Sequence, residues 1–243
     1  MRKLIVLGAC SSIAQEVEKI AAHAGKEMLL VARSEERLAR LRQDLLVRGA
    51  SVVLTFAMDF DDLTTHEELL KFAERNFPDF DAVLLAFGSM LNQSESEVSA
   101  DLTVRQLHTD FISAAALLTR IGNYFAACKQ GVIGVITSVA GDRSRRANYV
   151  YGTAKAALTF FVAGLRTRLR SAGVAVITFK PGPVATKMTA HLQQGILFSE
   201  PQRVAQDIYY ALERAPSKVL YSPWYWRYIM AIVRVVPESL LNR

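Results

Sequence analysis

The amino-acid sequence predicts an α/β protein built on a doubly wound, seven-stranded parallel sheet with helices on both faces. Short apolar runs alternate regularly with longer segments whose apolar residues recur at helical spacing. The short runs are apolar almost throughout, as expected for strands that are covered on both faces. In folds of this kind ligands bind at the carboxyl ends of the strands, so we expect the chemistry in the loops that follow them.

Seven segments are predicted as strands and six as helices. The strands are residues 4–7, 28–32, 52–56, 82–86, 132–136, 174–179 and 219–221. The helices are residues 13–24, 35–48, 63–76, 104–129, 149–171 and 201–215. Segment 104–129 fits either one bent helix or two consecutive helices. No repeat or linker divides the chain, so we expect a single domain over 1–243, in which 222–243 forms a helical extension rich in aromatic and basic residues.

Composition is that of an ordinary globular protein, with 51% hydrophobic and 21% charged residues. The net charge of +6 suits an anionic partner, but the charge is diffuse and no nucleic-acid motif occurs, so no nucleic acid is expected. Cys10 and Cys128 lie far apart without metal-ligand spacing, which predicts free thiols in a reducing cytoplasm and no metal site. No apolar run matches a signal peptide or the roughly 20 residues of a membrane span.

Three residues, Ser138, Tyr151 and Lys155, say most about the chemistry. The tyrosine and the lysine are four positions apart and share one face of a predicted helix. A nearby ammonium favours the phenolate, so it lowers the pKa of a tyrosine from its usual value of about 10. Ser138 follows the strand at 132–136, where its hydroxyl can bond the same substrate oxygen. The spacing alone also fits an ordinary helix face, so the rest of the chain must decide.

A turn of small residues follows the first strand, in the order Gly8-Ala9-Cys10-Ser11-Ser12-Ile13-Ala14. Such a turn closes tightly and leaves backbone N–H groups at a helix N-terminus facing a pyrophosphate. A tight strand-to-helix turn that binds no ligand is the alternative.

Together with Ser138, Tyr151 and Lys155, this turn resembles the T-G-x-x-x-G-x-G segment of the short-chain dehydrogenase/reductase family, whose fold is of the Rossmann type. Gly8 matches the first glycine, and Ser12 stands at the second, where glycine would adopt the backbone angle more easily. The resemblance implies an NAD(P)(H)-dependent oxidoreductase that converts a ketone to an alcohol. Tyr151 would donate the proton, Lys155 would lower its pKa and hold the nicotinamide ribose, and Ser138 would orient the carbonyl.

The resemblance extends to two later segments. Asp59, which follows the third strand, matches an acidic residue that contacts the adenine, and 180–186 resembles the Pro-Gly segment beside the nicotinamide, in which Thr186 holds the carboxamide. The resemblance therefore implies cofactor contacts from Gly8, Cys10, Ser11, Ser12, Ile13, Asp59, Phe60, Gly88, Tyr151, Lys155, Pro181, Gly182, Val184 and Thr186.

The choice between the two dinucleotides depends on Arg33, which follows the second strand. An acidic residue there would bind the ribose 2′-hydroxyl, whereas an arginine pairs with a 2′-phosphate. Arg33 therefore favours NADP(H), with NAD(H) as the alternative if this arginine is only a solvated surface residue.

The chain departs from the family pattern in two places. Leu85-Ala86-Phe87-Gly88 replaces the usual Asn-Asn-Ala-Gly, which removes amides that brace the sheet. Asp110 replaces an asparagine that holds a water near the catalytic lysine, and aspartate keeps the acceptors but loses the donor. An ionised Asp110 would either pair with Lys155 and weaken its effect on the tyrosine, or position the relay water. An ordinary helix position is the third alternative.

The substrate side is indicated by Arg143, Arg145 and Arg146, which either bind an anion or form a solvated basic loop. This segment resembles a bacterial branch that includes the decaprenylphosphoryl-2-keto-erythro-pentose reductase, which implies a keto sugar on a polyprenyl phosphate. Another carbonyl substrate, such as a fatty-acyl, steroid-like or small ketone, is the rival, and a catalytically weak dinucleotide sensor or assembly subunit is a rival of another class.

The C-terminal segment carries aromatic, basic and apolar residues. On a helix, one face holds Arg227, Met230 and Arg234, and another holds Trp224, Tyr228, Ala231 and Val235. This pattern suits either peripheral contact with the inner membrane surface or a helix packed over the substrate site or a second subunit. The resemblance also implies a homo-oligomer.

Overall fold

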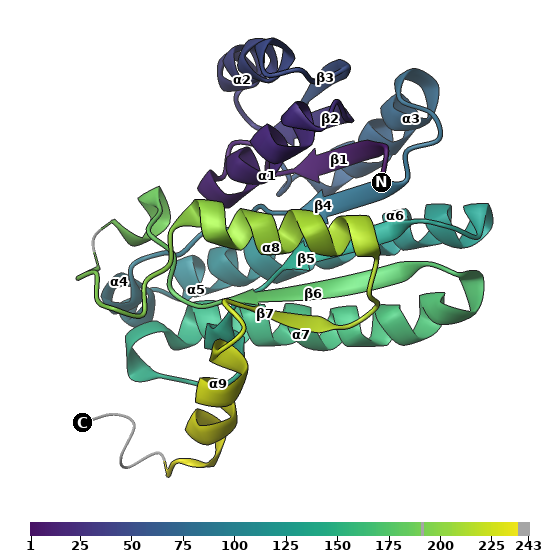
Figure 1. Ribbon diagram of the computed structural model, residues 1–243. Helices are drawn as coiled ribbons and strands as arrows, with labels where there is room; N and C mark the ends of the chain where they lie inside the picture. Colours follow the sequence, from purple (N-terminus) through teal and green to yellow (C-terminus); the bar gives the residue numbers. More distant parts are fainter. Residues whose placement is uncertain (191, 238–243) are drawn as a thin grey trace.

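The structure, a computed structural model, describes residues 1–190 and 192–237. Within these residues seven strands form one parallel sheet in the order β3-β2-β1-β4-β5-β6-β7 (Figure 1). The strands are β1 (Lys3–Leu7), β2 (Glu27–Ala32), β3 (Val52–Ala57), β4 (Ala82–Leu85), β5 (Val132–Ile136), β6 (Ala175–Pro181) and β7 (Val219–Ser222). The predicted doubly wound sheet is confirmed, and each predicted strand occurs within about two residues of its expected bounds.

Helices cover both faces of the sheet. They are α1 (Ser12–His23), α2 (Glu35–Val47), α3 (His66–Asn76), α4 (Gln93–Val98), α5 (Ala100–Leu107), α6 (Ala114–Cys128), α7 (Tyr149–Leu169), α8 (Pro201–Arg214) and α9 (Trp226–Val235). Apolar residues of α1, α2 and α8 form a core on one face, and those of α3, α6 and α7 form a second core on the other. The strands are therefore buried on both sides, which explains why they are apolar throughout.

Segment 104–129 forms part of one uninterrupted helical stretch, Ala100–Cys128, in which a π-helical turn, His108–Ser113, separates α5 from α6. By length and composition this stretch is apolar enough to cross a membrane. Leu117 and Leu118 on α6 are nevertheless completely buried in the core beneath the sheet, so it packs as the core helix of a globular fold. The π-helical turn matters because such turns often present functional side chains.

The predicted extension 222–243 contains α9, which leaves the sheet at the carboxyl end of β7 (Figure 1). Trp226 and Met230 on α9 are buried in a small third core with Val139. Residues 238–243 lie outside the described part of the chain. The aromatic and aliphatic face predicted for this helix points away from the protein, since Trp224, Tyr228 and Val235 are all exposed.

The strand order reverses between β1 and β4, which extend the sheet in opposite directions. In a parallel sheet the loops that follow two such strands diverge and leave a crevice between them. The turn after β1, the loops after β4, β5 and β6, and the start of α7 all meet at this edge of the sheet.

Candidate active site

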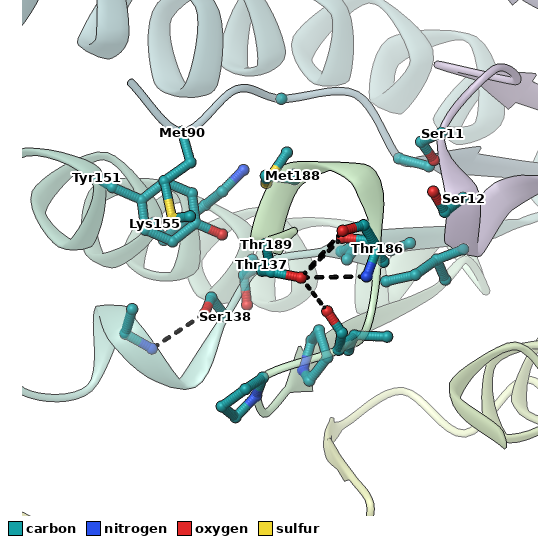
Figure 2. Close-up of a pocket in the computed structure, with 18 of the residues that line it drawn as sticks. Ser11, Ser12, Met90, Thr137, Ser138, Tyr151, Lys155, Thr186, Met188 and Thr189 are labelled. Atoms are coloured by element: carbon teal, nitrogen blue, oxygen red, sulfur yellow. Dashed lines mark hydrogen bonds between the residues drawn. The ribbon is translucent and has the colours of Figure 1, made fainter. Parts of the chain in front are cut away.

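A cavity of about 410 Å³ lies at the carboxyl ends of the strands. Its lining comes from the turn after β1, the loops after β4, β5 and β6, the first two turns of α7 and the start of α9. Figure 2 shows Tyr151, Lys155 and Ser138 toward one end of this cavity and Ser11 and Ser12 at the other, with Thr186, Met188 and Thr189 between them. The predicted catalytic and phosphate-binding segments thus share one space.

The predicted catalytic residues lie together. Tyr151 and Lys155 occupy the first two turns of α7, and the lysine Nζ lies 5.5 Å from the centre of the tyrosine ring. The Ser138 hydroxyl accepts a hydrogen bond from the backbone N–H of Ala140 at 3.1 Å, and its interaction with the Tyr151 side chain lowers the pKa of that phenol. The bond from Ala140 begins a short 3-10 turn and fixes the serine where β5 ends. The helix face predicted from the spacing of the tyrosine and the lysine therefore points into the cavity.

The turn after β1 has the geometry of a phosphate-binding loop. Gly8 has a φ of +91°, and a Cβ on it would lie 2.5 Å from the backbone nitrogen of Phe87, so only glycine fits. The side chain of Ser11 caps α1 by accepting from the N–H of Ala14 at 3.3 Å. Ser12 is the first residue of α1 and has no positive φ, so the expected preference for glycine at this position was wrong. The helix N-terminus that faces the cavity suits the pyrophosphate of a dinucleotide.

Comparison with known proteins agrees with this arrangement. A family model described as short chain dehydrogenase matches residues 2–196. An uncharacterized oxidoreductase of Mycobacterium tuberculosis is 34% identical over 240 residues, which cover 99% of this chain and 96% of that protein. The chain belongs to the short-chain dehydrogenase/reductase family. It is thus an NAD(P)-dependent oxidoreductase whose general chemistry is consistent with carbonyl reduction.

Solved structures show the same fold. A short-chain type dehydrogenase/reductase from Mycobacterium ulcerans has a TM-score of 0.81 at 19% identity, over 90% of this chain and 87% of that one. A 3-oxoacyl-[acyl-carrier protein] reductase from Brucella melitensis has a TM-score of 0.79 at 18% identity, over 90% of this chain and 89% of that one. At these identities the likeness shows the fold alone.

Electrostatics within the triad act in opposite directions. Burial raises the pKa of Tyr151, and the Asp110 carboxylate raises it further, while Lys155 and the hydrogen bond from Ser138 lower it. The net direction is upward. Burial lowers the pKa of Lys155, but the neighbouring Asp110 and Tyr151 outweigh burial and raise it. The site therefore holds a protonated phenol beside a charged ammonium, which is the form of the tyrosine that donates a proton.

Asp110 is part of this site and not an ordinary helix residue. It lies on the π-helical turn, is 1% exposed, and its Oδ1 is 3.6 Å from the Nζ of Lys155. The same Oδ1 accepts from the backbone N–H of Ser89 at 2.8 Å, and Oδ2 accepts from the side-chain amide of Gln106. Of the alternatives open from the sequence, the geometry matches pairing with the lysine.

The predicted site residues divide into two groups. Those that line the cavity are Cys10, Ser11, Ser12, Ile13, Gly88, Ser138, Arg145, Tyr151, Lys155, Pro181, Gly182, Val184 and Thr186. Those outside its lining are Gly8, Arg33, Asp59, Phe60, Asp110, Arg143 and Arg146. Gly8 and Asp110 act on the site from outside this lining, because Gly8 allows the close approach of the Phe87 backbone and Asp110 pairs with Lys155. The ring of Phe60 stacks on Phe87 at 4.2 Å, so an aromatic pair joins the loop after β3 to the loop after β4.

Sequence reasoning missed three residues of the site. Arg37 lines the cavity, and its Nη2 donates to the backbone oxygen of Cys10 at 3.0 Å; its position one helical turn after Arg33 was a usable signal. Gln106 lies one turn before Asp110 on the same helical stretch, which could also have been recognised. Trp226 had no such signal, because the start of α9 reaches the cavity only through the folding of the loop after β7.

Replacing Asp110 by asparagine tests whether Asp110 and Lys155 have opposite effects on the pKa of Tyr151. Asp110→Asn removes a carboxyl group that raises the pKa of Tyr151, so the pKa of that phenol should fall. The pH at which ketone reduction declines should move down, because reduction needs the protonated phenol. Alcohol oxidation, which needs the phenolate, should begin at a lower pH. The measurement is kcat/KM against pH in both directions.

Asp44→Asn is the matched control, because Asp44 pairs with Arg48 on the surface of α2 and its removal changes the net charge equally. An unmoved profile in Asp110→Asn would show that the aspartate has no electrostatic role.

Proposed function

We propose that this protein reduces a ketone to an alcohol with NADPH. The observation that carries the proposal is the convergence of Ser138, Tyr151 and Lys155 on the cavity that the phosphate-binding turn also lines. The raised pKa of Tyr151 favours the reductive direction, because a proton donor must be protonated at the working pH. The general reaction follows from the family, and its direction and cofactor preference are inferences from these residues.

In this mechanism the substrate carbonyl oxygen accepts hydrogen bonds from the hydroxyls of Ser138 and Tyr151. When bound, the dinucleotide supplies the hydride that the carbonyl carbon receives. As negative charge develops on the oxygen, Tyr151 transfers its phenolic proton to it, and the resulting phenolate is stabilised by the ammonium of Lys155. The phenol then regains a proton from solvent, which leaves an alcohol and the oxidised cofactor. Thr186, Gly182 and the N-terminus of α1, which line the cavity, would hold the dinucleotide.

Replacing Tyr151 by phenylalanine tests the proton donor. Tyr151→Phe should lower kcat/KM about 10²- to 10⁴-fold, because it removes the acid and keeps the ring. Binding of NADPH, measured by calorimetric titration, should persist. Tyr149→Phe is the control, since Tyr149 lies two positions earlier on α7, is 40% exposed and does not line the cavity. A panel of ketones should include a polyprenyl-phosphate keto sugar. Cofactor binding without turnover of any ketone by the native protein would favour the dinucleotide-sensor alternative.

We propose NADP(H) as the preferred cofactor. Arg33 directly follows β2, and Arg37 lies one turn into α2 against the phosphate-binding turn. No acidic side chain occupies either position, so two guanidinium groups are available for a 2′-phosphate.

The ratio of kcat/KM with NADPH to that with NADH measures this preference. Arg37→Gln should lower the ratio about 10- to 100-fold, the usual effect of losing a hydrogen bond to a charged group. Arg40→Gln is the control, because Arg40 on the same helix pairs with Glu36 on the surface. A native enzyme that clearly prefers NADH would contradict the proposal.

We propose a keto sugar carried on a polyprenyl phosphate as the substrate. Arg145 lines the cavity and offers a guanidinium to an anion, while Met90 and Met188 provide apolar lining. Arg143, by contrast, donates to the backbone oxygen of Val236 at 3.1 Å and so connects its loop to the end of α9. Fatty-acyl, steroid-like and small ketones are the rival substrates, because the three catalytic residues act on any carbonyl.

We further propose that the protein acts in the cytoplasm as a homo-oligomer that touches the inner membrane surface. Both cysteines are free thiols, which suits a reducing compartment. Phe160 on α7 is 84% exposed beside an apolar hollow, a face that a second copy would cover. Tyr228 on α9 and Trp224 in the turn before this helix form a separate exposed surface, which suits a lipid interface.

Two charge insertions separate these surfaces. Phe160→Glu should reduce the mass measured by light scattering and leave flotation with anionic phospholipid vesicles intact, because only the α7 face is changed. Tyr228→Glu should abolish flotation and leave the mass unchanged. A native protein that is monomeric would contradict the first assignment, and one that does not float would contradict the second.

A further inference from the structure

Trp226 brings an unused hydrogen-bond donor to the cavity from outside the segment that matches the family. It is the first residue of α9, it is 4% exposed, and it lines the same cavity as Ser138 and Tyr151. Its indole Nε1 is buried and has no hydrogen-bond partner. A buried donor without a hydrogen-bond partner destabilises the folded protein, and most buried donors have one. A bound molecule that brought an acceptor to this N–H would remove that cost.

The indole edge that carries this donor lies against the Pro-Gly segment after β6. A Cβ built on Gly182 would be 1.9 Å from Nε1, so the tryptophan fits there only because residue 182 is glycine. Gly182 is itself a lining residue of the cavity. The indole nitrogen therefore lies beside a wall of the cavity that Ser138 and Tyr151 also line.

A buried ionic cluster fixes α9 in this position. Asp142, four residues after Ser138, forms an ion pair with Lys180 at the end of β6, and both side chains are almost completely buried. The other oxygen of Asp142 accepts from the hydroxyl of Tyr221 at 2.7 Å and from Arg234 on α9 at 3.0 Å. Because a buried charge is held firmly by its partners, the catalytic loop, β6, β7 and α9 are joined at one point.

We propose that Trp226 determines substrate specificity by donating its indole N–H to an oxygen of the substrate other than the reacting carbonyl. The reacting oxygen already has Ser138 and Tyr151, so the third donor selects ketones that carry a further oxygen, such as a hydroxy ketone or a keto sugar. A plain ketone of the same shape would leave this donor unpaired and bind less well. This inference rests on the proposed ketone reduction.

A binding experiment reads the donor directly. Trp224 and Trp226 are the two tryptophans of the chain. Trp224→Phe leaves Trp226 as the sole indole, and Trp226→Phe leaves the exposed Trp224. Each variant is saturated with NADP⁺, which prevents reduction, and then titrated with 2-hydroxycyclohexanone or cyclohexanone. A new hydrogen bond moves indole emission to longer wavelength. We expect that shift only in Trp224→Phe with the hydroxy ketone.

Kinetics with the same two ketones supply the second measurement. In the native enzyme kcat/KM should be higher for the hydroxy ketone, and Trp226→Phe should reduce this preference about tenfold, the effect of one lost hydrogen bond. Trp224→Phe should leave the preference unchanged. Taking a ratio of two substrates cancels any general loss of folded or active protein.

The outcomes separate this inference from the proposed function. Turnover of both ketones with an unchanged preference in Trp226→Phe would overturn the role of the tryptophan and leave the reductase intact. An emission shift on adding NADP⁺ alone would also overturn it, because the acceptor would then belong to the cofactor. A shift with the hydroxy ketone but no turnover in the native protein would support the donor and contradict ketone reduction.

Discussion

A buried ammonium is the constraint on which the active site depends. Lys155 must lie close to Tyr151 to stabilise the phenolate, and this position removes it from water, with 4% of its surface exposed. A charge removed from water is costly unless it is paired, and here the fold supplies an anion. Asp110 does so from the π-helical turn. The aspartate in turn requires the amide of Gln106 and the N–H of Ser89, so the lysine determines how the α5–α6 stretch and the loop after β4 pack.

The same pairing changes the chemistry that the lysine performs. An asparagine in place of Asp110 would leave the ammonium as the dominant charge beside the phenol, whereas the aspartate cancels part of its field. The phenol of Tyr151 then stays protonated over a wider pH range, and the catalytic group is held as an acid. A substitution that is conservative in size thus shifts the balance of the site toward proton donation.

The sequence was sufficient for features that depend on local periodicity, and insufficient for those that depend on tertiary packing. The seven strands could be predicted because burial on both faces leaves a short apolar run that a single pass along the chain detects. The pair Tyr151 and Lys155 could be predicted because helix geometry fixes their neighbourhood. The stack of Phe60 on Phe87 joins the loop after β3 to the loop after β4, and no local sequence pattern predicts such a contact. Arg37 lies one helical turn after Arg33, but only the packing of α2 against the turn after β1 brings its guanidinium to the cavity.

The lining of the active-site cavity comes from two parts of the chain, the segment that matches the family and the C-terminal helix. The matched segment, residues 2–196, contains the phosphate-binding turn and all three catalytic residues, so it accounts for the reaction. It does not contain Trp226, which reaches the cavity from beyond that segment. The reaction shared by a whole family does not determine which substrate is chosen. Trp226, outside the shared segment, therefore adds a contact to those that Arg145, Met90 and Met188 offer from within it. The Asp142 cluster provides the connection, because it ties α9 to the loop that carries Ser138 and to the end of β6. A change at Trp226 therefore alters a wall of the cavity, while Ser138, Tyr151 and Lys155 are positioned by β5 and α7.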